Sequence, residues 1–107
     1  MAFVYLLGDS GQDNIYKIGV TRGKIEKRIK QLQTGNANEI YLIDFYETKY
    51  PFFIERWLHI KFYPRQKIGE WFFLKDNEVF NFKKDCSIME ENAKSLKGNP
   101  FAIKILK

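Results

Sequence analysis

The chain has 107 residues, of which 45% are hydrophobic, 17% aromatic and 29% charged, with a net charge of +5. This composition is typical of one folded domain, which we expect to span 1–107, and excludes a disordered chain. Cys86 is the single cysteine, so no internal disulfide can form, and one cysteine with one histidine is too few for a structural zinc site. With no recognisable signal peptide and no apolar stretch near the ~20 residues of a membrane span, we expect a cytoplasmic protein without membrane contact or a disulfide-linked partner.

The first third of the sequence predicts two strands and a helix. Residues 3–7 and 15–20 are rich in β-branched and aromatic side chains. The turn-forming residues between them predict an antiparallel hairpin with a fairly long loop. A helix is expected over about 23–33, with Thr21 as its N-cap and Gly35 just after its end.

The remaining sequence predicts a third strand and two more helices. The nearly continuous apolar run 39–46 is typical of a central strand covered on both faces. One helix follows Pro51 and extends to about Tyr63, and a longer one spans about 77–96. Their apolar stripes are Ile54, Leu58 and Phe62 in the first helix, and Val79, Phe82, Cys86, Met89, Ala93 and Leu96 in the second.

The expected order of elements is therefore strand, strand, helix, strand, helix, helix, which is an α+β domain with a small sheet covered by helices. Gly98 and Pro100 are expected to end the last helix. The alternation in 101–107 is weak, and an added strand, a docked segment and a frayed end all remain open.

Basic residues are concentrated in two segments. Residues 17–30 contain six basic side chains and one acidic side chain, and residues 56–67 contain four basic side chains and no acidic one. Two such clusters in a small domain predict a surface that attracts a polyanion such as a phosphate backbone. A solvated basic surface without a ligand is the alternative.

Arg28 and Glu55 are charged residues at or beside positions where the helical pattern expects apolar ones. Arg28 lies three residues after Ile25 on the inward face of its helix, where its guanidinium either extends to solvent or meets an anion such as phosphate. Glu55 borders the apolar stripe of the next helix, and a half-buried carboxylate needs a partner. The candidate partners are Arg28, a divalent metal and His59; an ordinary Glu–His helix pair is the alternative.

Tyr5 and Tyr16 fall in the two paired strands, close to Lys17 and Gly19. Aromatic side chains in strands usually pack in the core. A glycine inside a strand is less ordinary, and Gly19 indicates a bulge or the close approach of a ligand's backbone.

Five segments in this order resemble the GIY-YIG nuclease superfamily, in particular its short phage-type branch. The segments are "VYL" at 4–6, "YKIGVT" at 16–21, "EKRI" at 26–29, "IERWLHIKF" at 54–62 and "GEWFFL" at 69–74. The resemblance covers 3–75 and leaves the C-terminal part, 76–107, outside. The chain departs from the family at Phe3, which replaces a glycine, and at Lys17, which stands where most members have a tyrosine.

The resemblance implies a three-stranded antiparallel sheet flanked by helices (β-β-α-β-α-α). It also implies a DNA endonuclease that hydrolyses phosphodiester bonds with Mg²⁺ or Mn²⁺ held by Glu55, and a phage protein would act in the host cytoplasm. The expected catalytic residues are Tyr5, Tyr16, Lys17, Arg28, Glu55 and His59. The expected DNA-binding residues are Gly19, Arg22, Lys24, Lys61, Arg65, Lys67 and Trp71.

In the expected chemistry, Tyr5 accepts or relays a proton if Lys17 or another cation lowers its pKa, while Arg28 braces the scissile phosphate. The alternative function is a binding module of the same fold, catalytically weak or inactive, that binds nucleic acid or a protein partner. Arg65, Lys67 and Trp71 suit either function, because all three can contact a nucleic-acid strand. A purely structural domain without salt-sensitive DNA affinity is a third possibility.

Overall fold

The computed structural model describes residues 2–96, so the expectations for Gly98, Pro100 and 101–107 lie outside the described residues. The elements are β1 (Ala2–Asp9), β2 (Gln12–Thr21), α1 (Ile25–Gln33), β3 (Ile40–Thr48), α2 (Pro51–Phe62), the 3-10 helix η1 (Tyr63–Arg65), β4 (Gln66–Ile68), β5 (Trp71–Phe73), α3 (Asp76–Phe80) and α4 (Phe82–Leu96). They form one five-stranded antiparallel sheet in the order β3-β1-β2-β5-β4. The α+β class is confirmed. No helix within 2–96 is long and apolar enough to cross a membrane.

The sheet has two more strands than the three that were expected. The segment that contains β4 and β5 was interpreted as a basic loop followed by a short apolar piece. Each of these strands is only three residues long, too short to show an alternating pattern. They form a small hairpin, which joins the sheet through antiparallel pairing of β5 with β2.

The central strand is β1, which pairs with β2 on one side and β3 on the other. Its residues from Val4 to Asp9 are all buried. The expectation that 39–46 forms the central strand is wrong, because β3 lies at an edge of the sheet and only its end residues Ile40 and Thr48 are buried. Tyr41, Leu42 and Phe45 of β3 are among the exposed large hydrophobic side chains.

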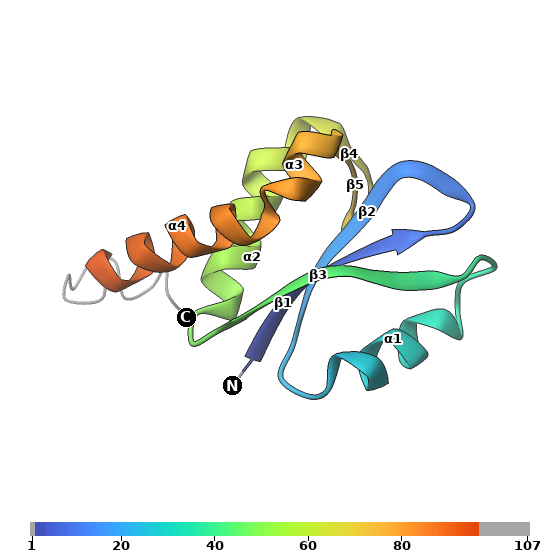
Figure 1. Cartoon of the computed structure of the whole chain (residues 1–107), viewed down its shortest axis with the longest axis horizontal. Coiled ribbons are helices and arrows are strands. Elements are labelled where there is room, and N and C mark those ends of the chain that lie inside the picture. The colour runs from blue at the N-terminus through green and yellow to red at the C-terminus, as the bar shows by residue number, and fades with distance from the viewer. Residues whose placement is uncertain (1, 97–107) are drawn as a thin grey trace.

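Helices α2 and α4 lie on one face of the sheet and α1 on the other (Figure 1), and a hydrophobic core lies on each face. The larger core packs α2 and α4 against one face and contains Val4 and Leu6 of β1. The smaller core packs α1 against the other face and contains Tyr5 and Leu7. Alternate residues of β1 therefore serve different cores, as the two-residue period of a strand requires.

The hairpin β1–β2 is closed by a tight turn at Ser10 and Gly11, so the expected long loop is wrong. Asp9 stabilises this turn, because its Oδ1 accepts a hydrogen bond of 2.8 Å from the backbone N–H of Gly11. Thr21 also forms a turn instead of capping α1: its hydroxyl oxygen accepts a hydrogen bond of 3.2 Å from the backbone N–H of Gly23, before the helix begins.

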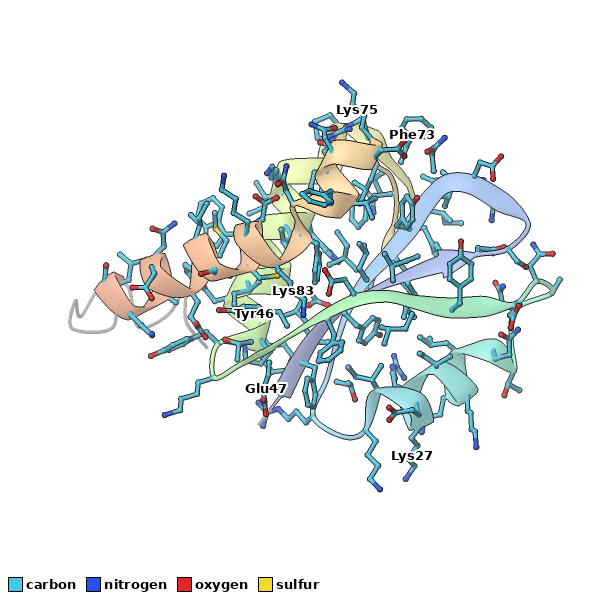
Figure 2. The ribbon with its side chains drawn as sticks, in the orientation of Figure 1. Lys27, Tyr46, Glu47, Phe73, Lys75 and Lys83 are labelled. Atoms are coloured by element: carbon cyan, nitrogen blue, oxygen red, sulfur yellow. The ribbon has the colours of Figure 1, made fainter. Side chains whose placement is uncertain are left out.

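The expected helix over 77–96 is two helices, α3 and α4, separated at Asn81. The apolar stripe is nevertheless inward, since Phe82, Cys86 and Ala93 are buried. Helix α4 is also attached to β3, where Tyr46 is labelled in Figure 2. Glu90 of α4 accepts hydrogen bonds from the hydroxyls of Tyr46 (2.7 Å) and Thr48 (2.8 Å).

Candidate functional site

The pairing of β5 with β2 stops partway along β2 and leaves part of its edge open. Strand β5 pairs with residues 15–17 of β2, and the backbone N–H of Ile18 donates to the carbonyl of Glu70 at 3.1 Å. Strand β2 continues to Thr21 without this neighbour. Side chains from β1, α1, α2 and the β4–β5 turn converge near this open edge.

Tyr5 and Arg28 meet in the smaller core. The Tyr5 side chain is 1% exposed, and its hydroxyl oxygen accepts a hydrogen bond from Nε of Arg28 at 3.4 Å. Arg28 also donates to Oε1 of Gln31 at 3.4 Å. The arginine on the inward face of α1 therefore reaches the phenol of Tyr5, and its guanidinium is only partly buried.

Gly19 makes room for the Tyr5 ring, which lies opposite it in the β1–β2 register. A Cβ atom at position 19 would lie 2.5 Å from Cζ of Tyr5. The register of this strand pair shifts only between Gly8 and Asp9, so Gly19 is not at a bulge. An aromatic ring of the chain itself, not the backbone of a ligand, explains the glycine in the strand.

The phenol of Tyr5 is a weaker acid than an ordinary tyrosine. Burial raises its pKa, and the negative charges of Glu70 and Glu55 add to this, although Arg28 acts in the opposite direction. The expectation that Lys17 or another cation lowers this pKa is wrong, because desolvation outweighs the effect of Arg28. Lys17 instead forms an ion pair with Glu70, with Nζ 3.1 Å from Oε1.

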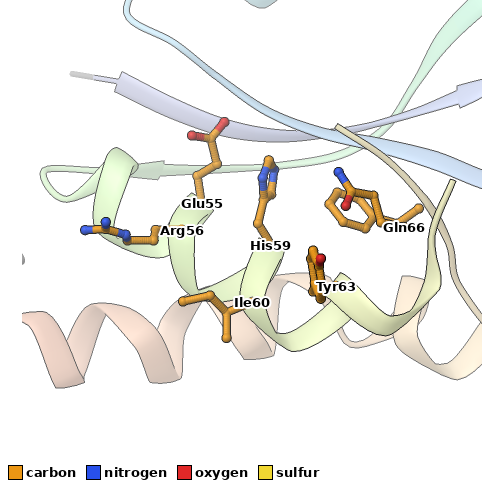
Figure 3. A pocket seen from close by; sticks show the side chains of 7 residues that line it. Glu55, Arg56, His59, Ile60, Tyr63 and Gln66 are labelled. Carbon is orange, nitrogen blue, oxygen red and sulfur yellow. The ribbon is translucent and has the colours of Figure 1, made fainter. Parts of the chain in front are cut away.

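Glu55 and His59 project from adjacent turns of α2. In Figure 3 the Glu55 carboxylate and the His59 ring both point toward the strands, whereas Ile60 points away. Both side chains line a pocket of about 580 Å³, together with Arg56, Ile60, Tyr63, Gln66 and Phe72.

Glu55 has no ion-pair partner among the described residues, and neither Arg28 nor His59 takes this role. Glu70 is the charged neighbour that changes the pKa of Glu55 most. Burial, together with the negative charge of Glu70, raises the pKa of Glu55 to about 7, and Lys17 only partly offsets this. Two carboxylates that face one another under partial burial create a local excess of negative charge.

His59 is held in one orientation and one tautomer. Its Nε2 lies 2.9 Å from the carbonyl oxygen of Ile18, and a carbonyl only accepts, so Nε2 must carry the proton. The ring also packs against Phe72, with centroids 4.9 Å apart. In the neutral ring, Nδ1 of His59 is therefore the nitrogen that carries the lone pair.

One ligand atom from each of Glu55, His59 and Glu70 lies within 4.8 Å of the others. Among residues 2–96, this is the group of acidic, histidine and cysteine side chains whose spacing suits a metal ion. Glu70 was absent from the residues expected from the sequence. The available signal was its place as the first acidic residue after the basic segment 56–67, just before Trp71.

Tyr16 lies on the opposite face of the sheet from Tyr5. It packs against the larger core and pairs with Phe72 of β5, and burial raises its pKa. The strand period separates it from Arg28. Tyr16 thus supports the packing beneath the site and does not meet the residues that converge at the open edge.

Several of the expected DNA-binding side chains are engaged within the domain. Lys61 pairs with Asp85 at 2.8 Å, Arg65 forms two hydrogen bonds to the carboxylate of Glu78, and Lys67 donates to Gln12. Trp71 packs against the smaller core, with Nζ of Lys17 5.6 Å from its ring centroid.

Arg22 and Lys24 are exposed beside the start of α1. Arg22 lies over the ring of Phe52, with Cζ 5.2 Å from the ring centroid. Arg22 and Lys24 also line a pocket of about 410 Å³ with Phe3 and Phe45. These two cations therefore form the more accessible part of the expected binding surface.

Comparison with known protein families identifies the chain. Residues 2–87 match the family model of the T5orf172 domain. The chain belongs to the T5orf172 domain family. The family occurs in nuclease-like proteins of phages and bacteria, which is consistent with a role connected with DNA. Neither the curated proteins nor the solved structures contain a match to this chain.

The expected membership of the GIY-YIG superfamily is therefore wrong, because the T5orf172 domain is a distinct family. The short segments that carried the resemblance lie within the T5orf172 match. This match continues to residue 87, past the limit of 3–75 that the motifs implied, and so includes α3 and the first part of α4.

Proposed function

We propose that this T5orf172 domain is a divalent-metal-dependent DNA endonuclease with its site at the open edge of β2. One observation carries the proposal: Arg28 contacts Tyr5 at the place where Glu55 and Glu70 influence the same phenol. A cation that can grip phosphate, a buried phenol and paired carboxylates are thereby assembled from separate elements. Membership of a family found in nuclease-like proteins supports this interpretation.

The reaction adds water across one P–O ester bond of DNA. The water oxygen bonds to phosphorus, one of its protons passes to a base, and the departing sugar oxygen receives a proton. Negative charge grows on the phosphoryl oxygens, so a guanidinium such as that of Arg28 stabilises the transition state. A divalent ion, Mg²⁺ or Mn²⁺ held by Glu55, would contribute further charge neutralisation.

Tyr5 acts in this proposal as a neutral phenol. Its raised pKa makes it a poor base near neutral pH, but a phenol that accepts from Arg28 keeps its own proton available for donation. We therefore assign Tyr5 to orienting Arg28 and hydrogen bonding to a phosphate oxygen or to the attacking water. Tyr5 does not accept the proton of the attacking water in this mechanism.

DNA would approach across the start of α1, where Arg22 and Lys24 are exposed. Such phosphate contacts position the duplex and make binding weaken with salt. Arg65 is a weaker candidate for this role, since its guanidinium is already occupied by Glu78.

A second candidate function is a nucleic-acid-binding module that does not cut. The burial of Tyr5, 1% exposed, favours it, because a reacting group must reach the substrate. Lys17 favours it too, since its ammonium pairs with Glu70 and is 12% exposed at the side chain. Both functions require basic side chains that bind DNA phosphates, and they differ only in whether the DNA is cleaved.

The deciding experiment is a cleavage assay on supercoiled plasmid and branched DNA with Mg²⁺ or Mn²⁺. We expect Arg28→Ala and Glu55→Gln to reduce cleavage by about 10²-fold or more, since Arg28 supplies positive charge to the transition state and Glu55 would hold the metal ion. Tyr5→Phe is expected to reduce it as well. The matched control is Lys27→Ala, which removes a neighbouring charge from the outer face of α1 (Figure 2) and should cut normally.

Absence of cutting by the folded wild-type protein on every substrate would overturn the nuclease proposal. Salt-sensitive DNA binding that persists in Glu55→Gln, without cleavage, would establish the binding module in its place. Equal loss of cutting in Lys27→Ala and Arg28→Ala would show that general charge, not the site, is responsible.

A further inference from the structure

Three side chains from two separate elements surround one point near the open edge of β2. Glu55 and His59 are four residues apart on α2, and Glu70 comes from the turn between β4 and β5. One potential ligand atom of each lies within 4.8 Å of the others. Ligands of one ion with bonds of about 2.0–2.2 Å lie roughly 3–4 Å apart, so small side-chain rotations suffice to close this group around a cation.

The hydrogen bond made by His59 leaves one of its ring nitrogens available to a metal ion. Nε2 donates to the carbonyl oxygen of Ile18 at 2.9 Å, which leaves Nδ1 as the nitrogen with a free lone pair. A hydrogen bond from the second ring nitrogen to a backbone carbonyl is the usual way in which proteins fix a metal-binding histidine. Packing against Phe72 holds the ring from the side.

The electrostatics of the group favour a cation. Glu55 and Glu70 are both partly buried, and their carboxylate oxygens lie within 4.8 Å of one another. The ammonium of Lys17, 3.1 Å from Glu70, compensates one carboxylate. Among the described residues no basic side chain forms an ion pair with Glu55, so one negative charge is left over.

We propose that Glu55, His59 and Glu70 bind one divalent cation through two carboxylate oxygens and Nδ1 of His59, and that the site prefers transition-metal ions to Mg²⁺. Imidazole nitrogen is a good ligand for Zn²⁺ and its neighbours in the first transition row, whereas Mg²⁺ selects oxygen ligands and retains its water. The inference deepens the proposed function by naming the ion class and two further ligands, and rests on that function for its biological purpose.

Lys17 is the competitor of the metal in this arrangement. Its ammonium occupies Glu70, and a bound cation would face it across the same carboxylate. Replacement of Lys17 by methionine keeps an unbranched side chain only one atom shorter and removes the charge. We therefore expect Lys17→Met to bind the ion several-fold more tightly than the wild-type protein.

The test is isothermal titration calorimetry of the purified chain, which measures the dissociation constants of Mn²⁺, Zn²⁺ and Mg²⁺ in the absence of DNA. We expect one site, with Mn²⁺ bound at least about tenfold more tightly than Mg²⁺ and Zn²⁺ more tightly still. Glu55→Gln, His59→Gln and Glu70→Gln should each weaken Mn²⁺ binding by about tenfold or more. Glu39→Gln, an exposed acidic residue elsewhere, is the matched control and should bind as the wild type does.

Binding of Mn²⁺ that is no tighter than that of Mg²⁺, or that survives both His59→Gln and Glu70→Gln, would overturn the inference. Circular dichroism of each variant separates loss of a ligand from loss of the fold, and tighter binding by Lys17→Met provides a gain that misfolding cannot produce. DNA cleavage that Mg²⁺ supports and that both His59→Gln and Glu70→Gln retain would refute the three-ligand site but leave the proposed nuclease intact. Metal binding by all three ligands without any cleavage would support the site and refute the nuclease.

Discussion

At the scale of single residues, Gly19 is a position where a side chain cannot fit unless Tyr5 moves. The Tyr5 ring lies where a side chain at position 19 would begin, and both residues are on paired strands that cannot easily separate. We expect Gly19→Ala to lower the free energy of unfolding by about 1–3 kcal/mol, as overpacking of a filled core does. Urea unfolding followed by circular dichroism measures this change.

Gly35 provides the comparison for Gly19. A Cβ atom at position 35 would meet no atom within 4 Å, so Gly35→Ala should be neutral or slightly stabilising. If the two alanine variants unfold at the same urea concentration, then the Tyr5 ring does not depend on the space above Gly19.

Site residues could be predicted from the sequence where a charged side chain interrupts the apolar pattern of a helix. Arg28 and Glu55 interrupt helical stripes, so the sequence alone singled them out, and both lie at the candidate site. Glu70 breaks no pattern, because it sits in a two-residue turn between strands that are themselves too short to detect. The reason for Gly19 was equally hidden, since it depends on which residue of β1 lies opposite.

At the scale of elements, η1 and α3 are joined by one ion pair. Arg65 of η1 donates two hydrogen bonds to Glu78 of α3, and this contact lowers the pKa of Glu78 to about 2. The ordinary value is 4.5, so the contribution of Glu78 to stability is present above about pH 4.5 and is lost as the pH falls toward 2.

Glu78→Gln removes this contribution and so tests the junction. We expect the variant to be less stable than the wild type at pH 7 by on the order of 1 kcal/mol, with the difference shrinking between pH 4.5 and 2. Urea unfolding at several pH values gives the comparison. Glu91→Gln, at a side chain that is 70% exposed, is the control and should show no such convergence. A constant difference at all pH values would contradict the role of Arg65.

The long helices and strands were predictable from the sequence, but their positions in the fold were not. The stripes of α2 and α4 follow from spacing alone, and Ile54, Leu58 and Cys86 are buried as expected. The apolar run of β3 was assigned to the centre of the sheet, but its position depends on pairing with β1, which the sequence of β3 does not encode. The interruption at Asn81 was equally hidden, because the apolar spacing continues across it.

At the scale of the whole molecule, Cys86 reports on global unfolding. Its side chain is fully buried in the larger core, and burial raises the pKa of its thiol to about 12. A thiol reagent needs the exposed thiolate, so the native protein should react at pH 8 at least about 100-fold more slowly than the urea-unfolded chain.

The control for this measurement is Ile88→Cys, because residue 88 is 46% exposed on the same helix. The thiol introduced there should react at once, while Cys86 remains protected. Similar rates for the two thiols would show that α4 leaves the sheet frequently without unfolding of the whole domain.

Tyr5 belongs both to the smaller core and to the candidate site, which limits the substitutions that evolution can accept at this position. The same ring fills the smaller core with Leu7 and Ile40 and contacts Arg28 through its hydroxyl. Replacing the partly exposed Glu55 would change little in the packing, but replacing Tyr5 by a smaller residue would open a cavity beneath α1. If the domain is the nuclease proposed above, a relative that has lost cleavage would therefore still keep this tyrosine, and its presence in a related sequence would be weak evidence of activity.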